Sequence, residues 1–120
     1  MEKTVLIVSD AAFLKMMISD TLSKNGYQIV GKARNGKEGI EEYMKLKPDL
    51  VIMEMTMPEM DGLEATKAIL AKEPSAAILL MSSIGAECMM IEAAKAGAKE
   101  YLVKPFKREM LLHKVAHALQ

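Results

Sequence analysis

The sequence has little of what disulfide-stabilised, nucleic-acid-binding or membrane-binding proteins usually carry. It contains one cysteine, Cys88, so no disulfide bond can form within the chain. Lysine plus arginine and aspartate plus glutamate each number 16. A chain without net charge has no overall field that would hold a phosphate backbone or an anionic membrane. We therefore expect neither nucleic acid nor a membrane as a partner.

Long apolar stretches are absent as well. The sequence has no run of about twenty apolar residues that could cross a bilayer, and no charged-then-apolar leader at its N-terminus. These absences predict a soluble cytoplasmic protein. The 120 residues lie within the roughly 100–200 that one domain occupies, so we expect a single domain over residues 1–120.

Aromatic residues are scarce, at 4% of a chain that is 51% hydrophobic, and twelve methionines fill part of the difference. Methionine is flexible and polarizable, so it fills irregular core space and also makes adaptable binding surfaces. Five methionines flank the candidate functional segments described below: Met55, Met57, Met60, Met89 and Met90. Some should be buried, and any exposed ones would form an apolar rim suited to a helix of another protein.

Five short apolar runs predict strands that are covered on both faces, as in a parallel sheet. They span residues 4–8, 27–30, 50–53, 77–81 and 101–103. Segments of helical period lie between them, with apolar stripes at Leu14, Met17, Ile18 and Leu22, at Ile40, Tyr43 and Met44, and at Leu111, Leu112, Val115 and Leu119. Glycines or prolines end these segments, at Asn25-Gly26, Lys47-Pro48, Glu73-Pro74 and Ala96-Gly97.

Five strands that alternate with five helices, through short connections, predict a doubly wound α/β domain with right-handed crossovers. In such open sheets, ligands bind just beyond the carboxyl ends of the strands. Four of the five predicted ends carry polar groups: Ser9 and Asp10, Glu54, Ser82 and Ser83, and Lys104-Pro105. Packing alone does not require acids, hydroxyls and an amine at one edge, so we expect a functional pocket there.

The spacing of these residues, together with the segments VLIVSDAAF, MPEMDG and AKAGAKEYLVKPF, resembles the receiver domain of two-component response regulators. The resemblance covers essentially the whole chain and is closest to the stand-alone, CheY-like type. It implies the flavodoxin-like strand order 2-1-3-4-5 and a cis Lys104-Pro105 bond. It also implies phosphorelay signalling by a non-enzymatic protein without an output domain.

In receivers, an aspartate at the end of the third strand accepts a phosphoryl group from a histidine kinase, next to a bound Mg²⁺. The resemblance places Glu54 at this acceptor position. The metal positions correspond to Asp10, Glu54 and the backbone carbonyl of Thr56, and Ser9 stands where a further acid is usual. The switch and phosphate-binding positions are Ser82, Tyr101 and Lys104.

Two departures from the family pattern bear on the chemistry. Serine at position 9 removes an acid, which weakens a Mg²⁺ site that depends on the number of charged oxygen ligands. Glutamate at position 54 moves the carboxylate on the order of 1 Å beyond the place of an aspartate, an error that costs about a hundredfold in a positioned reaction. We therefore expect weak or lost Mg²⁺ binding and little phosphorylation.

Glu54 would instead reach toward Lys104 and Ser82 and imitate the modified acceptor. The pocket would then be locked on or locked off, and the sequence does not choose between these states. By resemblance, the partner is a histidine kinase or a downstream target. It would bind the fourth helix, fifth strand and fifth helix, where Tyr101 rotates between buried and exposed positions as the segment from Ser82 to Lys104 shifts. We expect a monomer or a weak dimer.

Three other functions remain open. One is a conventional phosphorylatable receiver in which Glu54 was introduced to imitate phosphoaspartate, and another is slow residual phosphorylation with Mg²⁺ on Asp10 and Glu54. The third is a flavodoxin-like enzyme or mononucleotide binder. It is disfavoured because the first strand leads into SDAAF and not into a phosphate cradle.

Several of these residues also have structural explanations. Ser9 or Asp10 could cap the first helix, Ser82 or Ser83 could cap the fourth, and Tyr101 could cover an outer strand. The pair His113 and His117 could chelate a metal, but we expect surface positions because no nearby acid or cysteine completes a ligand set. Cys88 is expected to serve packing.

Overall fold

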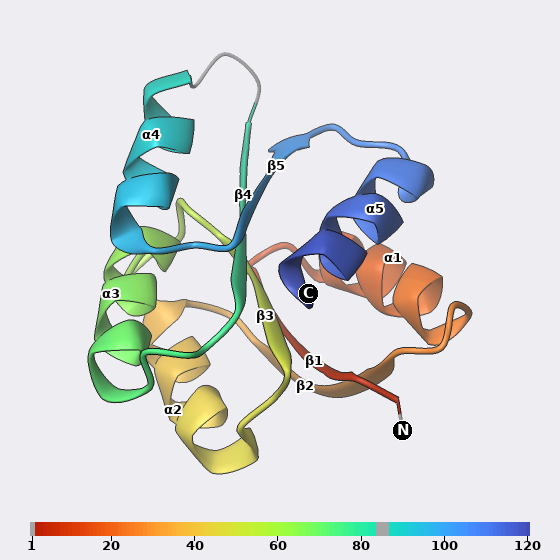
Figure 1. Cartoon of the computed structure of the whole chain (residues 1–120), viewed down its shortest axis with the longest axis horizontal. Coiled ribbons are helices and arrows are strands. Elements are labelled where there is room, and N and C mark those ends of the chain that lie inside the picture. Colours follow the sequence, from red (N-terminus) through yellow and green to blue (C-terminus); the bar gives the residue numbers. More distant parts are fainter. Residues whose placement is uncertain (1, 84–86) are drawn as a thin grey trace.

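Five parallel strands form the centre of the molecule (Figure 1). The computed structural model describes residues 2–83 and 87–120. The strands are β1 (Thr4–Val8), β2 (Gln28–Ala33), β3 (Leu50–Glu54), β4 (Ile78–Ser83) and β5 (Glu100–Lys104). Their order across the sheet is β2-β1-β3-β4-β5. This arrangement confirms the predicted doubly wound α/β fold and its strand order.

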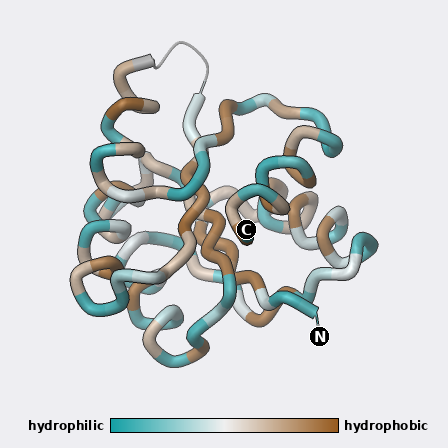
Figure 2. The backbone as a smooth tube through the Cα atoms, viewed as in Figure 1, coloured by the Kyte–Doolittle hydropathy of each residue, from teal (hydrophilic) through white to brown (hydrophobic). Residues whose placement is uncertain are grey.

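The inner strands β1, β3 and β4 are buried on both faces, as their continuous apolar sequences predict. Figure 2 shows the hydrophobic residues concentrated along the central strands. The parallel register pairs Val8 with Met53 and Glu54 with Met81. The carboxyl ends of β1, β3 and β4 therefore meet at one edge of the sheet.

Five helices cover the two faces of the sheet: α1 (Ala12–Ser23), α2 (Gly36–Leu46), α3 (Gly62–Lys72), α4 (Glu87–Ala96) and α5 (Arg108–Ala118). Helices α1 and α5 lie on one face, and α2, α3 and α4 lie on the other (Figure 1). Each face has its own core cluster of buried aliphatic and methionine side chains. No helix within the described ranges has the length and apolar character needed to span a bilayer.

The helix ends follow the local chemistry of the sequence. Side-chain oxygens of Asn35 and Asp61 cap α2 and α3 by accepting hydrogen bonds from the Glu38 and Glu64 backbone N–H groups. Gly97, with φ of +100°, follows α4, as the predicted glycine stop requires. The other predicted stops also fall directly after helices.

All strands except β1 extend beyond the apolar runs that predicted them, and β2 and β4 continue furthest past the carboxyl end of the run. Strand β2 continues through Gly31 and Lys32 to Ala33, and β4 continues through Ser82 and Ser83. In β4 the extra residues pair with Val103 and Lys104 of β5, so the backbone ladder persists where side-chain hydrophobicity ends. The expectation that Ser82 or Ser83 caps α4 is wrong, since both belong to the strand.

The loop from β3 to α3 packs tightly against the end of β3. The Gly62 N–H donates to the Met55 carbonyl oxygen over 2.9 Å. A Cβ atom on Gly62 would lie 2.0 Å from the Glu54 carbonyl oxygen, so only glycine allows this approach. The backbone that follows Glu54 is thereby held close to the sheet.

Candidate functional site

Glu54 is the centre of the polar pocket at the carboxyl edge of the sheet. It is the last residue of β3 and is only 6% exposed. The Ser9 hydroxyl donates a short hydrogen bond to Glu54 Oε1, and the Lys104 ammonium group donates one to Oε2. The structure thus joins three residues that lie at the ends of three different strands. Both oxygens of the carboxylate therefore accept a hydrogen bond.

Ser9 follows β1 and is completely buried. Its backbone N–H donates to the Ala33 carbonyl oxygen at the end of β2, and its Oγ accepts from the Ala11 backbone N–H, each over 3.0 Å. The N-cap of α1 is Ala11, without a side-chain cap. The alternative that Ser9 or Asp10 caps α1 is therefore wrong, because the Ser9 hydroxyl is directed at Glu54 instead.

Lys104 is the last residue of β5, with a side chain that is 26% exposed. The peptide bond between Lys104 and Pro105 is cis, as the resemblance implied. The stem of Lys104 reaches from the edge strand toward β3, across the end of β4. This position gives the ammonium group access both to the buried carboxylate and to solvent.

Ser82 and Tyr101 lie on the same face of the sheet. Tyr101 pairs with Leu80 in the register of β4 and β5, and Ser82 is two residues beyond Leu80. Side chains alternate along a strand, so Ser82 and Tyr101 both point to the α4 side, where Leu80 packs. Ser82 is buried and directly follows Met81, the partner of Glu54. Strand β4 therefore borders the polar pocket at Met81 and Ser82 and pairs with Tyr101 at Leu80.

Asp10 and Thr56 both occupy exposed loop positions, after β1 and after β3 respectively. The Met55 N–H donates to the Met81 carbonyl oxygen over 2.8 Å, which carries the β3–β4 pairing one residue past Glu54 and brings Thr56 to the rim. Across residues 2–83 and 87–120, no three His, Cys, Asp or Glu side chains lie close enough together to hold a metal ion. The Mg²⁺ roles of Asp10, Glu54 and Thr56 stay predictions.

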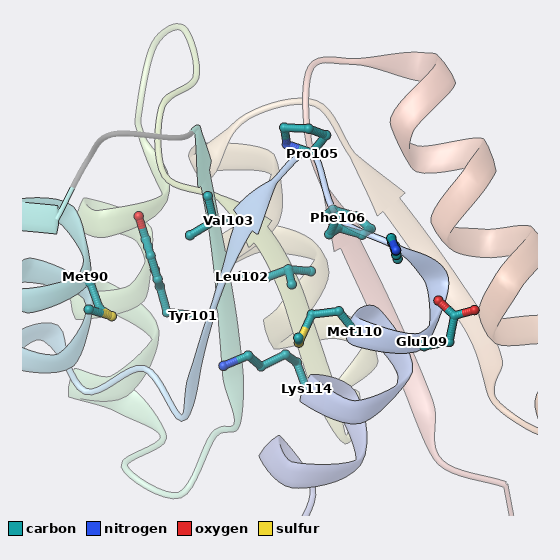
Figure 3. Close-up of a pocket in the computed structure, with 10 residues that line it drawn as sticks. Met90, Tyr101, Leu102, Val103, Pro105, Phe106, Glu109, Met110 and Lys114 are labelled. Carbon is teal, nitrogen blue, oxygen red and sulfur yellow. The ribbon is translucent and has the colours of Figure 1, made fainter.

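A groove lies between α4, β5 and α5, on the face that the sequence predicted for partner binding (Figure 3). Its volume is about 510 Å³, and we call it the α4–β5–α5 groove. The apolar residues that line it are Met90, Tyr101, Leu102, Val103, Pro105, Phe106 and Met110. Figure 3 shows Tyr101 beside Met90 of α4, and Met110 of α5 on the opposite side of β5. Met90 is 51% exposed and Met110 is 47% exposed, so they form an apolar rim.

The other methionines divide between core and surface. Met55 and Met57 are buried, while Met60 and Met89 are partly buried and pack against the core on the α2–α4 face. Only Met90 of the five near the site is strongly exposed. The prediction for Cys88 is wrong: its side chain is exposed on α4 and does not serve packing.

Glu100 connects β5 with α5 through contacts with Lys114 and His117. Its Oε1 lies 3.0 Å from Lys114 Nζ, and its Oε2 lies 2.5 Å from His117 Nδ1. Burial raises the pKa of Glu100, but hydrogen bonds from the Lys114 ammonium and the Tyr101 backbone N–H outweigh it and hold the pKa below its ordinary value. The histidines are exposed, as predicted. Glu100 contacts His117 across the packing of β5 and α5, a proximity that the sequence spacing did not indicate.

A second groove opens between α1 and the loop from β5 to α5, with a volume of about 700 Å³. Phe13, Leu14 and Met17 of α1 form one wall, and Pro105 and Phe106 form the other. Lys104 lines its inner end, next to the polar pocket. Phe13 is 76% exposed, which the sequence analysis did not anticipate.

This fold and the polar pocket at its carboxyl edge define a receiver domain, and comparison with known proteins agrees. The response regulator receiver domain model matches residues 5–116. The chain therefore belongs to the response regulator receiver family. It is 52% identical to the chemotaxis protein CheY of Thermotoga maritima over 107 residues, which cover 89% of each chain. It is 45% identical to CheY of Bacillus subtilis over 119 residues, which cover 99% of each.

A solved structure with the same fold is the complex of CheX with CheY, BeF₃ and Mg²⁺ from Borrelia burgdorferi. The TM-score is 0.94 at 28% identity, over 98% of this chain and 90% of that one. With these relatives, the chain is a CheY-like receiver domain of two-component signalling.

Proposed function

We propose that residues 1–120 form one receiver domain that signals through protein contact and whose acceptor position, Glu54, is held by an ion pair and is not normally phosphorylated. The observation that carries this proposal is the pairing of the buried Glu54 carboxylate with Lys104 and Ser9. In a phosphorylated receiver, the lysine neutralises a phosphoryl group. Here the carboxylate of Glu54 already lies against this cation, so Glu54 takes the place of the modified acceptor.

Phosphoryl transfer depends on positioning and on charge neutralisation. The attacking oxygen must be free and in line with the phosphorus atom. Both oxygens of Glu54 have donors at hydrogen-bonding distance, and the Ser9 donor is itself fixed by the Ala11 N–H. An incoming phosphodonor would have to displace a buried ion pair, and this favours slow or absent transfer.

The residues at this edge fit Mg²⁺ poorly. Mg²⁺ requires near-octahedral oxygen ligands and binds through carboxylates. Position 9 offers a hydroxyl group that donates its proton to Glu54, and the second carboxylate oxygen faces an ammonium group. Asp10 and the Thr56 carbonyl oxygen remain as candidate ligands. We infer that Mg²⁺ affinity is weakened, and no step of the proposed function runs through the metal.

Signal output would occur at the α4–β5–α5 groove, to which a histidine kinase or a downstream target would bind. Tyr101, Leu102 and Val103 line this groove and immediately precede Lys104 on β5. A change in the Glu54–Lys104 pair would therefore act on groove residues through one strand. The Borrelia CheY structure contains a protein partner, CheX, which is consistent with partner recognition by this kind of domain.

The test is incubation with acetyl phosphate and Mg²⁺, followed by intact-mass measurement. The chain should stay unmodified, and the matched variant Glu54→Asp, which shortens the side chain toward the usual acceptor, should gain more phosphoryl adduct than the starting chain. A phosphoryl adduct on the starting chain that disappears in Glu54→Ala would refute the proposal. It would favour residual phosphorylation instead.

A further inference from the structure

The hydroxyl group of Ser9 lies between two hydrogen-bond partners, the Ala11 N–H and the Glu54 carboxylate. The residue is completely buried, and its backbone is fixed by the hydrogen bond to the Ala33 carbonyl oxygen. The Ala11 N–H donates to Ser9 Oγ over 3.0 Å and so uses an acceptor site of this oxygen. The hydroxyl proton is left for Glu54 Oε1, the acceptor that it contacts. Ser9 is therefore a hydrogen-bond donor to the carboxylate.

The second donor, Lys104, approaches the same carboxylate from the other side of β3. Ser9 follows β1, which neighbours β3, and Lys104 ends β5, which is separated from β3 by β4. A carboxylate with a donor at each oxygen is fixed in orientation, because charge-assisted hydrogen bonds are short and directional. Without the Ser9 donor, Glu54 could adopt other rotamers, and Lys104 would lose a fixed partner.

An acid at position 9 could not take over this role. An ionised carboxylate accepts hydrogen bonds and donates none, so it would place a second negative charge against Glu54 in a buried site. A shorter aspartate at position 54 would withdraw on the order of 1 Å and reduce this conflict. The residue types at positions 9 and 54 therefore constrain each other.

We propose that Ser9 is the positioning residue of the pocket: its hydroxyl holds Glu54 against Lys104, and Ser9 and Glu54 form a matched pair that an acid at position 9 would break. The inference rests on the ion pair of the proposed function. It concerns which residue orients this pair and why serine, usually counted as a lost metal ligand, is suited to glutamate.

The first test is a double-mutant cycle of Ser9→Ala and Lys104→Met, with the equilibrium constant of folding measured by urea denaturation. Ser9→Ala should lower this constant about tenfold when Lys104 is present. In the Lys104→Met chain, the factor by which Ser9→Ala lowers the constant should be several-fold smaller. The control is Ser23→Ala at the exposed end of α1, whose effect should be equal in both chains. Equal losses for Ser9→Ala in the two chains would overturn the proposal, since a purely structural serine does not depend on Lys104.

The second test introduces Ser9→Asp into the starting chain and into Glu54→Asp. The factor by which Ser9→Asp lowers the equilibrium constant of folding should be at least about tenfold smaller in the Glu54→Asp chain than in the starting chain. Ser75→Asp, in an exposed turn far along the chain, should act equally in both. An equal loss for Ser9→Asp would overturn the matched pair. If neither Ser9→Asp chain folds, the Ser9→Ala cycle decides the question.

Failure of this inference and failure of the proposed function give different results. Additive effects of Ser9→Ala and Lys104→Met, in a chain that acetyl phosphate leaves unmodified, would remove the positioning role of Ser9 alone. Coupled effects in a chain that acquires a phosphoryl group on Glu54 would remove the proposed function alone.

Discussion

The carboxylate of Glu54 and the ammonium group of Lys104 form an ion pair between the last residue of β3 and the last residue of β5. The strand between them, β4, contributes Ser82 at the same edge. A buried charge pair of this kind gives little stability in itself, but removal of one member leaves the other without compensation.

Replacement of Glu54 by glutamine should destabilise the chain and shift Ser82 and Tyr101. Glutamine keeps only one acceptor oxygen for the two donors, Ser9 and Lys104, and it removes the negative charge that pairs with the ammonium group. Because Lys104 is partly exposed, we expect a loss of about 1–3 kcal/mol in the free energy of unfolding. Backbone NMR shifts of Ser82 and Tyr101 should change, and Glu92→Gln on the exposed face of α4 should leave them in place. Unchanged shifts in Glu54→Gln would contradict an influence of Glu54 on the switch positions.

Removal of the Glu100 carboxylate should cost stability at neutral pH but not in acid. The pKa of Glu100 in the folded chain lies below the ordinary value of 4.5. Its contribution is therefore complete above the pKa of the unfolded chain and is lost as the pH falls through the lower, folded pKa. Urea denaturation of Glu100→Gln should show a loss of about 1 kcal/mol at pH 7 that vanishes toward pH 3. Glu109→Gln, exposed on α5, is the control. A loss that stays constant across this pH range would show that the ionised Glu100 carboxylate and its contacts with Lys114 and His117 are not its source.

Truncation of core and groove methionines should have different effects. Met53 is completely buried in β3, and Met53→Ala should cost about 2–5 kcal/mol through lost burial and a cavity. Met90 is half exposed at the α4–β5–α5 groove, and Met90→Ala should cost less than about 1 kcal/mol. Both values follow from the midpoint and slope of urea denaturation. A large loss for Met90→Ala would mean that this side chain supports the fold and is not available for a partner.

The two glycines Gly62 and Gly26 should respond differently to alanine. Gly62→Ala places a Cβ atom 2.0 Å from the Glu54 carbonyl oxygen, so the loop must move and the loss should exceed about 2 kcal/mol. Gly26 has a positive φ of +89° in open space, so alanine there should cost only about 1 kcal/mol through its backbone conformation. Melting temperatures of the two variants would rank them. A reversed ranking would show that the loop after β3 adapts more easily than its contacts suggest.

Much of the fold follows from the sequence because the signals are local and repeated. Strand β1 was predicted with its final bounds, since a β-branched residue followed by four consecutive aliphatic residues favours a buried strand in a chain of alternating helices and strands. The ends of β4 were missed because Ser82 and Ser83 continue the ladder through backbone hydrogen bonds, which a hydrophobicity pattern does not report. The polar edge itself was predicted from the residues that follow each strand.

The pairing within the site was harder to predict. Position 9 suggested the loss of an acid or a helix cap, whereas the structure gives Ser9 a hydrogen bond to Glu54, 45 residues away. The contact between Glu100 and His117 joins separate elements and leaves no spacing signature. Exposure of Cys88 depends on which side of α4 faces the sheet. In each case a tertiary contact decides the outcome.

Strand β5 has a neighbour in the sheet on one side only. A small tilt of this outermost strand would disturb a single ladder of backbone hydrogen bonds, whereas the same movement of β3 would disturb two. The Lys104 ammonium group therefore belongs to a strand that needs less free energy to move than the inner strands do. A small displacement of Glu54 would shift this outer strand while the inner strands keep their positions.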